Sequence, residues 1–307
     1  MSEISILSPA TVANVVCGFD CLGFALSAPC DEMTVRIIEK KTVRIVNRDQ
    51  FNLPTEPEKN VAGAALLSML KAIDENFGFE VEITKHIKPG SGIGSSAASA
   101  AGAVVAANEL LDERFSKLEL IEFAMDGEKV ASDDRHADNV APCIFGGFTL
   151  VRSLAPLDVV TLNFPPLFVT VIHPQIEIKT SEARRMLPLQ VSLKDAIRQW
   201  SNVGALVSGL QKGNYELISR SLEDFIVETV RKSLIPKFDA IKNKSLKAGA
   251  LGGGISGSGP SVFMLSETSV TARKVENVMR EIYSETAIDF NIYVTKINAE
   301  GIKILEK

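Results

Sequence analysis

A chain of 307 residues that is 46% hydrophobic is long and apolar enough to build two domains with full cores. Its net charge of −5 argues against a nucleic-acid-binding protein, which usually presents a basic face. The three histidines are few and the four cysteines form no C-x-x-C pair, which argues against a zinc site or a disulfide framework.

The N-terminus has no basic segment followed by an apolar run, so we expect no signal peptide. The most apolar predicted helix, over residues 97–107, is too short and too rich in small residues to span a bilayer. We therefore expect a cytoplasmic protein with no membrane and no nucleic-acid partner.

The first half of the chain mixes strand and helix patterns. Its first strand is expected to end at Pro9, and the alternating segments 33–38 and 42–46 predict a hairpin. Ser116 and Glu119 form a capping box at the start of a helix. The half is expected to contain strands over 4–7, 33–38, 42–46, 81–84, 145–152 and 159–163 and helices over 60–76, 97–107 and 116–125.

A double proline at Pro165 and Pro166 interrupts these patterns. We place a domain boundary there, with domains over 1–165 and 166–307 and the active site between them. Because strands and helices follow each other without steady βαβ alternation, the fold class is expected to be α+β. The second half is expected to contain strands over 168–173, 261–266 and 291–296 and helices over 193–210, 214–225 and 269–284.

The segment 87–111, IKPGSGIGSSAASAAGAVVAANELL, predicts a glycine-rich loop that leads into the N-terminus of a helix. The first N–H groups of a helix lack intrahelical partners, so such a site holds a phosphate without basic side chains. A flexible linker is a poor explanation between a strand and a long helix. The loop contains neither the Walker A string nor a complete G-x-G-x-x-G between a strand and a helix.

This loop resembles the phosphate loop of the GHMP small-molecule kinases, P-x-x-x-G-[LM]-G-S-S-[AG], with Ile93 in place of Leu or Met. The resemblance implies ATP as a substrate. The nucleotide-binding residues that it implies are Asn60, Pro89, Gly90, Ser91, Gly92, Ile93, Gly94, Ser95, Ser96, Ala97, Ala98, Ser99 and Gly257.

A second glycine cluster covers residues 249–260. Its chance match to G-x-G-x-x-G is weak, because a strand and not a helix follows it. One tight turn would need fewer glycines than the six found here, so a backbone laid against a ligand is the better interpretation. The cluster resembles the third GHMP motif, which in that family lies beside the phosphate loop.

The segment 9–23, PATVANVVCGFDCLG, resembles the opening P-A-[TS]-x-A-N-x-G-x-G-F-D-x-L-G of homoserine kinases, with valine replacing the first glycine. Without that resemblance, Asn14 and Asp20 would be ordinary turn formers. In the family both face the amino-acid substrate, and a carboxylate at Asp20 suits an α-ammonium group.

The segment 126–142 would be a charged surface loop on composition alone. It resembles G-E-x-x-x-S-x-x-x-H-x-D-N-[VI]-A-P, which implies that Glu128 and Ser96 hold Mg²⁺ and that His136 and Asn139 face the substrate. Related kinases carry an aspartate as the presumed base near Asn139. Because an amide cannot accept a proton at neutral pH, no general base is evident.

Two further segments, 179–188 and 223–236, resemble T-x-x-A-R-x-[LM]-L-P and D-x-[IL]-x-E-P-x-R-x-x-L-I-P. On composition alone, Arg184 and Arg231 would be surface residues. The family places both on the substrate carboxylate. The implied catalytic residues are Ser96, Glu128, Asn139 and Thr180, and the implied substrate-binding residues are Asn14, Asp20, His136, Asn139, Arg184 and Arg231.

The chain thus resembles the homoserine kinases of the GHMP family from Pro9 to Pro260. The resemblance implies an N-terminal domain like ribosomal protein S5 domain 2, a ferredoxin-like C-terminal domain and a homodimer. It also implies MgATP-dependent phosphorylation of the side-chain hydroxyl of L-homoserine, a step of threonine biosynthesis. Another GHMP kinase acting on a different small alcohol, and a non-catalytic metabolite-binding homologue, are the alternatives.

Overall fold

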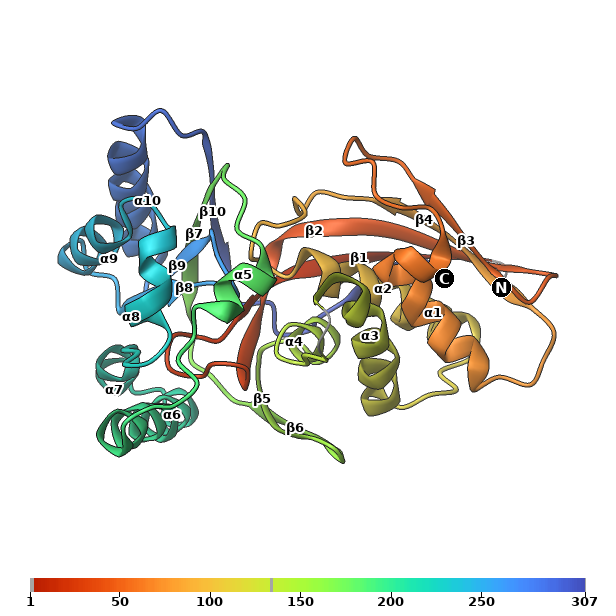
Figure 1. Ribbon diagram of the computed structural model, residues 1–307, viewed down its shortest axis with the longest axis horizontal. Helices are drawn as coiled ribbons and strands as arrows, with labels where there is room; N and C mark the ends of the chain where they lie inside the picture. Colours follow the sequence, from red (N-terminus) through yellow and green to blue (C-terminus); the bar gives the residue numbers. More distant parts are fainter. Residues whose placement is uncertain (1–2, 133–134, 307) are drawn as a thin grey trace.

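The computed structural model describes residues 3–132 and 135–306, so Asp133 and Asp134 of the segment 126–142 lie outside the described residues. The chain forms two sheets, each with helices packed on it (Figure 1). The sheets stand side by side along the long axis of the molecule, and the strands β1 (Glu3–Ala13) and β2 (Leu22–Ile38) extend toward the second sheet.

The first sheet has the order β11-β1-β2-β4-β3, with β5 paired to β2 and β6 paired to β5. Two sequence expectations are wrong here. β1 continues through Pro9, because its pairing with β2 shifts register between Pro9 and Thr11 and so accommodates a residue without an N–H. The expected hairpin does not form, because β4 lies between β2 and β3. The remaining strands are β3 (Val43–Asn47), β4 (Gly78–Thr84), β5 (Phe148–Leu154), β6 (Leu157–Leu162) and β11 (Lys303–Glu306).

Helices α1, α2 and α3 lie together on one side of the long strands (Figure 1). Alanines make α2 small enough to fit between the sheet and the other two helices, and a side chain at Gly102 would come within 2.5 Å of the sulfur of Met33. The expected capping box forms, with the N–H and hydroxyl of Ser116 donating to Glu119 at 2.8 and 2.7 Å. The helical elements are η1 (Pro57–Lys59), α1 (Val61–Lys71), α2 (Ser95–Leu110), α3 (Lys117–Ser132) and the unpredicted α4 (Val140–Phe145).

The second sheet is antiparallel, with the order β10-β7-β9-β8. Alternate residues of its central strands face two cores, because successive side chains of a strand point to opposite faces. Val171 and Phe263 belong to the large core shared with the first sheet, whereas Ile172 and Met264 belong to a smaller core under α9 and α10. The strands are β7 (Phe168–Pro174), β8 (Gly252–Ile255), β9 (Val262–Ser266) and β10 (Phe290–Lys296).

The helices of the second half agree only in part with the sequence patterns. The long amphipathic helices begin where expected, whereas the helix expected over 214–225 ends at Ser221, and four short elements were not predicted. The elements are α5 (Thr180–Arg185), α6 (Leu193–Lys212), α7 (Tyr215–Ser221), α8 (Glu228–Arg231), η2 (Lys232–Leu234), α9 (Phe238–Lys247) and α10 (Ser269–Ser284).

The chain passes from the first sheet to the second between β6 and β7, around Pro165 and Pro166. It then returns, because β11 pairs with β1, and both ends of the chain lie at the same end of the molecule (Figure 1). The division at residue 165 stays a prediction. One strand of the second half, β11, belongs to the first sheet and not to the second.

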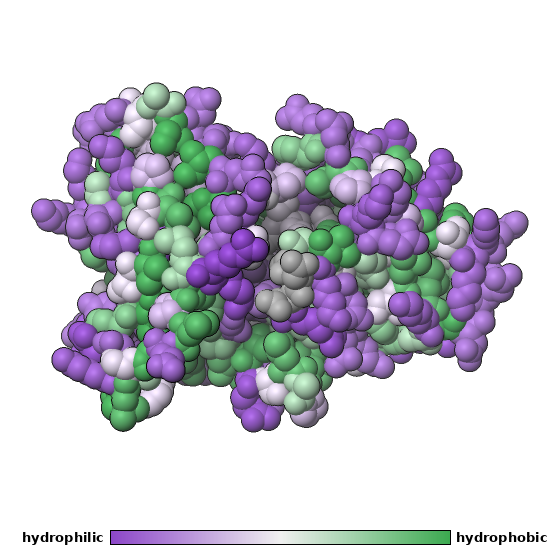
Figure 2. Space-filling model, in the orientation of Figure 1, coloured by the Kyte–Doolittle hydropathy of each residue, from purple (hydrophilic) through white to green (hydrophobic). Residues whose placement is uncertain are grey.

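Hydrophilic side chains cover much of the face shown in Figure 2, with hydrophobic ones in smaller groups between them. No helix within the described part of the chain is long and apolar enough to cross a membrane.

Candidate active site

A cavity of about 420 Å³ lies where the two halves of the molecule meet. The loop before α2 and the end of α3 line it from the first half, and α5 and the loop after β8 line it from the second half. Segments far apart in the sequence therefore meet at one cavity.

The N-terminus of α2 opens into this cavity. Gly94, the N-cap residue, has a φ of 68°. Because it is a glycine, no side chain at this position accepts a hydrogen bond from the first N–H groups of the helix. Its neighbours Ser95 and Ser96 line the cavity, so the first N–H groups of a 16-residue helix are directed to a ligand. This geometry suits a phosphate group, as the sequence predicted.

The second glycine cluster packs directly against this loop. The hydroxyl of Ser256 donates to the carbonyl of Gly92 at 2.7 Å, and the hydroxyl of Ser261 donates to the carbonyl of Ser91 at 2.6 Å. A Cβ atom at Gly92 would lie 2.5 Å from the carbonyl oxygen of Gly259. The glycines are therefore required for the close approach of two backbones, and Gly257 lines the cavity beside them.

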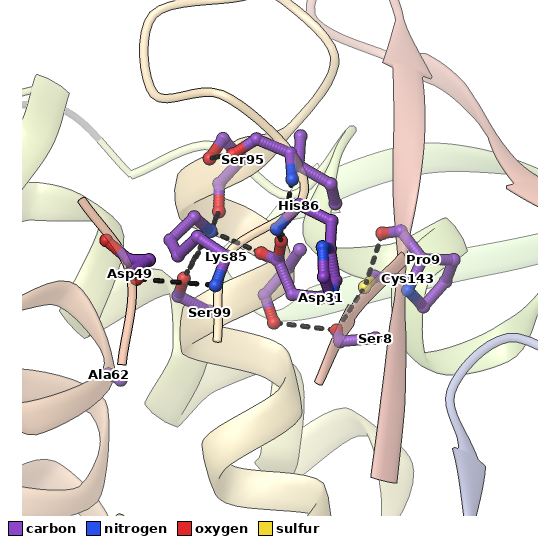
Figure 3. A network of polar contacts seen from close by, with 12 residues as sticks. Ser8, Pro9, Asp31, Asp49, Ala62, Lys85, His86, Ser95, Ser99 and Cys143 are labelled. Carbon is purple, nitrogen blue, oxygen red and sulfur yellow. Dashed lines mark hydrogen bonds and ion pairs between the residues drawn. The ribbon is translucent and has the colours of Figure 1, made fainter. Parts of the chain in front are cut away.

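Lys85 holds the loop from below (Figure 3). Its ammonium group pairs with Asp31 and donates at 2.8 Å to both the carbonyl of Ser95 and the hydroxyl of Ser99. Asp31 also accepts 2.8 Å hydrogen bonds from the backbone N–H groups of His86 and Ile87. Both side chains of this ion pair are almost fully buried, so the pair fixes the start of α2 relative to β2 and β4.

Ser96 and Glu128 form the pair that the sequence predicts for Mg²⁺. The hydroxyl of Ser96 donates to Oε2 of Glu128 at 3.0 Å. Burial raises the pKa of Glu128 from its ordinary value of 4.5 to about 7, against the opposing effects of Ser96 and of the charge of Lys85. A buried carboxylate beside a hydroxyl, next to a phosphate site, fits Mg²⁺, which prefers oxygen ligands and takes few from the protein.

The loop after β1 is strained. Asn14, Val15 and Val16 have φ angles of 71°, 41° and 63°, a left-handed conformation that β-branched residues rarely adopt. Contacts to the second half hold it, since Nδ2 of Asn14 donates to the carbonyl of Gly257 at 2.8 Å. Oδ1 of Asn14 accepts from the N–H of Asp20 at 3.0 Å. Strain of this kind concentrates at functional sites.

Asp20, Arg184 and His136 form one polar cluster in the cavity. The guanidinium of Arg184 donates to both carboxylate oxygens of Asp20, at 3.1 and 2.9 Å. It also lies 3.1 Å from Nε2 of His136. Because a guanidinium only donates, Nε2 accepts, and the ring proton lies on Nδ1, which is 3.9 Å from Asp20.

Arg231 is buried beside this cluster, although composition alone favours a surface residue. Its Nε donates to the carbonyl of Ala183 at 3.1 Å, and its guanidinium lies over the ring of Phe19 at 5.1 Å. Arg184 lies over the same ring at 5.6 Å. Burial and the charge of Arg184 lower the pKa of Arg231, so an anion between these two cations would be stabilised.

Asn139 is oriented by Thr11, whose hydroxyl donates to Oδ1 of Asn139 at 2.7 Å. This hydrogen bond fixes the orientation of the Asn139 amide, which lines the cavity. On the opposite side, Thr180 begins α5 with its hydroxyl 3.3 Å from that of Ser258.

The cavity brings together every residue predicted to be catalytic or substrate-binding. Asn60 also lines it, but its amide caps α1 by accepting from the N–H groups of Ala62 and Gly63 and donating to Pro54. Four of the predicted nucleotide-binding residues do not line the cavity because they are buried in the packing behind it, and their role stays a prediction. They are Ser91, Ile93, Ala97 and Ala98.

Sequence reasoning missed three kinds of residue at this site. No local pattern identified the ion pair of Lys85 and Asp31, because its two members are joined only by the pairing of β2 and β4. Phe19 and Thr11 stand inside the resembled opening segment without an assigned role. Asp138 lines the cavity and stands inside the resembled H-x-D-N string, which was the signal that could have identified it.

Known proteins resemble the chain over its whole length. The GHMP kinases N terminal domain matches residues 60–147 and the GHMP kinases C terminal domain matches residues 206–285, together more than half of the chain. Homoserine kinases from Chloroherpeton thalassium and Chlorobium phaeobacteroides are 42% and 44% identical to it, each match covering 99% of this chain and all of the relative.

The structure gives the same result. The crystal structure of homoserine kinase from Cytophaga hutchinsonii matches with a TM-score of 0.95 and 46% sequence identity, covering 99% of this chain and 98% of the other. The chain has the two-domain GHMP kinase fold and belongs to the homoserine kinase family of the GHMP kinases.

Proposed function

We propose that this protein transfers the γ-phosphate of ATP to the side-chain hydroxyl of L-homoserine, giving O-phospho-L-homoserine and ADP. One observation carries the proposal. A phosphate site at the N-terminus of α2 shares its cavity with Arg184, Arg231 and Asp20, charged groups of both signs. A kinase that acts on a free amino acid needs this combination, because it binds a nucleotide together with a carboxylate and an ammonium group.

The nucleotide would lie with its phosphates on the loop before α2. The glycines there allow phosphate oxygens to approach the backbone N–H groups closely. Leu53, Pro54, Val61 and Val130 line the same cavity and offer an apolar surface for the base. These contacts support ATP binding by this end of the cavity.

Ser96 and Glu128 would hold Mg²⁺ between the protein and the phosphates. When bound, the ion neutralises charge on the transferred phosphoryl group. Ionised Glu128 becomes more favourable beside a cation, which offsets the cost of its burial. Among the described residues, no group of three or more His, Cys, Asp or Glu side chains could hold a metal. A site of one carboxylate, one hydroxyl and substrate oxygens is consistent with that result.

The amino acid would lie between Phe19, the two arginines and Asp20. Its α-carboxylate would take the place between Arg184 and Arg231, and its α-ammonium group would pair with Asp20, with Asn14 supporting that loop. Asn139 and His136 would orient the rest of the substrate. Phosphoryl transfer depends mainly on such positioning and on charge stabilisation, so fixed geometry is the main contribution of the protein.

An ADP-release assay with L-homoserine, mevalonate, galactose and shikimate tests the proposal. We expect turnover of L-homoserine and poor turnover of L-threonine and L-serine. Turnover of mevalonate or a sugar without turnover of homoserine would instead identify a GHMP kinase for another alcohol. Binding of ATP and homoserine without ADP release from any alcohol would identify a non-catalytic homologue.

Three finer expectations stay proposals. The product would enter threonine biosynthesis, and the enzyme would work in the cytoplasm. It would also form a homodimer, for which exposed apolar residues near the start of α6 offer a surface, with Leu189, Leu193 and Trp200 being 103%, 70% and 57% exposed. Light scattering at micromolar concentration distinguishes a dimer from a monomer.

A further inference from the structure

Gln199 is a buried polar residue in a part of α6 that is mostly exposed. Leu193, Ile197 and Trp200 of this first half of the helix are 70%, 45% and 57% exposed. The other residues that α6 buries lie in its second half and are non-polar, namely Leu206, Gly209 and Leu210. A buried amide is costly unless its N–H and C=O groups find partners. The partners of Gln199 therefore indicate its role.

The amide of Gln199 bridges two segments that are far apart in the sequence. Its Nε2 donates to the carbonyl of Cys17 at 2.9 Å, and its Oε1 accepts from the N–H of Phe225 at 3.0 Å. Cys17 belongs to the loop after β1, and Phe225 belongs to the turn before α8. One side chain of α6 therefore ties this loop to this turn.

The loop after β1 has to be held by its surroundings, because the consecutive residues 14–16 have positive φ angles. Backbone strain of this kind persists only where neighbouring structure fixes it. The side chain of Asn14 holds the beginning of the strained stretch by donating to the carbonyl of Gly257. The hydrogen bond from Gln199 to Cys17 holds the residue directly after it. The strained stretch is thus fixed at both ends by contacts with the second half of the molecule.

The turn before α8 is fixed in a similar way. The carboxylate of Asp224 accepts hydrogen bonds from the backbone N–H groups of residues 226–228 at 2.8, 2.9 and 2.9 Å. The N–H of Phe225, inside the same turn, is bound by Gln199. Because Arg231 is the last residue of the short helix that follows, this turn sets where its guanidinium lies.

The loop and α8 also meet at the cavity. Phe19, two residues after Cys17, has the guanidinium of Arg231 5.1 Å from the centre of its ring. Both of these side chains line the cavity. The two segments therefore contact each other at the cavity through Phe19 and Arg231, and behind it through the amide of Gln199. A shift of Cys17 relative to Phe225 would move the ring relative to the guanidinium.

We propose that Gln199 is a positioning residue for the amino-acid substrate, an inference that rests on the proposed kinase function. It holds the loop of Asp20 and the helix of Arg231 at a fixed separation. The groups proposed to bind the α-ammonium and the α-carboxylate of homoserine therefore keep the spacing that one amino acid requires. Both hydrogen bonds of Gln199 go to segments at this end of the cavity, so nucleotide binding does not depend on them.

The test compares wild-type enzyme with Gln199→Met, Gln199→Asn and the control Gln211→Met. Methionine keeps the length of the side chain but lacks the amide, and asparagine keeps the amide but is one methylene too short to reach both partners. Gln211 is exposed near the end of the same helix. Steady-state kinetics give kcat and the KM for homoserine and for ATP. Calorimetry gives the Kd of homoserine and of a non-hydrolysable ATP analogue, and thermal unfolding measures folding.

We expect both Gln199 variants to fold and to raise the KM and Kd for homoserine by about tenfold or more, with kcat falling by less. The KM for ATP and the Kd of its analogue should stay within about threefold of wild type, and Gln211→Met should match wild type.

Three outcomes overturn the proposal. The first is a folded Gln199→Met enzyme with a KM for homoserine within about twofold of wild type. Equal rises in both KM values, or loss of folding in both variants, would make Gln199 a residue that supports the fold alone. If the wild-type enzyme phosphorylates only another alcohol, the proposed substrate is wrong, and the KM for that alcohol tests Gln199 in the same comparison. If it releases ADP with no alcohol, the Kd of homoserine decides.

Discussion

Ser256 donates a hydrogen bond of 2.7 Å to the carbonyl of Gly92, and so joins two glycine-rich segments that are 164 residues apart. The bond crosses between the two halves of the molecule at the phosphate loop. The conformation of that loop therefore depends on the packing of the second half. Glycine substitutions can distinguish two requirements of the loop: a positive φ angle, and space for the backbone of the second half.

Gly92→Ala should nearly abolish ATP binding and lower stability. An alanine there adopts a φ of 79° and brings its Cβ within 2.5 Å of a carbonyl oxygen, so one backbone has to move. Gly90 has a φ of 74° but open space, so Gly90→Ala should cost only the backbone strain, about 1–2 kcal/mol. Gly204→Ala in α6 has neither problem and should be neutral or slightly stabilising.

ATP affinity from calorimetry and the free energy of unfolding in urea check this series. The expected order of damage is Gly92, then Gly90, then Gly204. Equal effects of the Gly90 and Gly92 variants would show that backbone conformation, and not contact with the second half, makes Gly92 necessary.

The sequence predicted the elements with strong local patterns. The helix of Ser116 and the amphipathic α10 lie where hydrophobic spacing and caps indicate. It failed where pairing overrides local pattern. The hairpin of 33–38 and 42–46 is wrong because a later strand inserts between the two segments, and no local signal reports that insertion. Short helices such as α5 and α8 lack the length for a periodic signal.

At the site, too, residues within local motifs were predicted, whereas contacts between distant segments were not. The motifs brought the predicted charged residues to one cavity, because each motif carries its own loop geometry. The partners of those residues were not predictable. The hydrogen bond from Thr11 to Asn139, and the buried pair of Lys85 and Asp31, depend on the register of neighbouring strands and on helix placement. These contacts decide which atoms remain to meet a ligand.

Glu128→Gln should leave the fold intact and strongly weaken Mg²⁺-dependent activity. An amide oxygen is a far poorer ligand for Mg²⁺ than a carboxylate, although it can still accept the hydrogen bond from Ser96. Titration of kcat with Mg²⁺ checks this, and a shift of the midpoint by at least about tenfold is expected. Glu119→Gln, on the exposed start of α3, is the matched control. Near wild-type kcat at low millimolar Mg²⁺ would remove Glu128 from the metal site.

Arg231→Ala should raise the KM for homoserine more than the KM for ATP. The guanidinium is buried next to Arg184 over the Phe19 ring, and a shielded contact with a carboxylate is worth about 2–5 kcal/mol. Arg231→Lys should recover little, because an ammonium group lacks the planar fork. Arg198→Ala removes a guanidinium over Phe225 on the exposed face of α6 and serves as control. Equal changes in both KM values would assign Arg231 to the fold or to phosphate binding.

Asp138→Asn should change the pH dependence of stability in the ligand-free protein. The carboxyl group has a pKa of about 7 when folded and 3.8 ordinarily, so the folded state binds more protons between these values. The contribution of Asp138 to the free energy of unfolding of wild type therefore falls as pH rises through this window. An asparagine does not titrate and has no such dependence on pH. The free energy of unfolding of the variant, relative to that of wild type, should therefore increase by up to about 4 kcal/mol between pH 4 and pH 8.

Urea unfolding at several pH values measures this difference. Taking the difference between variant and wild type cancels the opposite effect of His173, whose burial lowers its pKa to about 4 and destabilises the protein at acid pH. A constant difference from pH 4 to pH 8 would mean that Asp138 keeps an ordinary pKa in the folded protein.

His136→Gln and Asn139→Asp test two polar side chains of the cavity that are expected to orient the substrate. His136 is tied to Arg184 and Asp20, so His136→Gln should keep measurable kcat and mainly raise the KM for homoserine. Asn139→Asp should give no gain, because the amide nitrogen that orients the substrate is lost and a second carboxylate stands beside Asp138. Steady-state kinetics with the chemical step shown to be rate-limiting measure both variants. A fall in kcat of about a thousandfold or more in His136→Gln would lie within the usual contribution of a general base and would identify the histidine as the base.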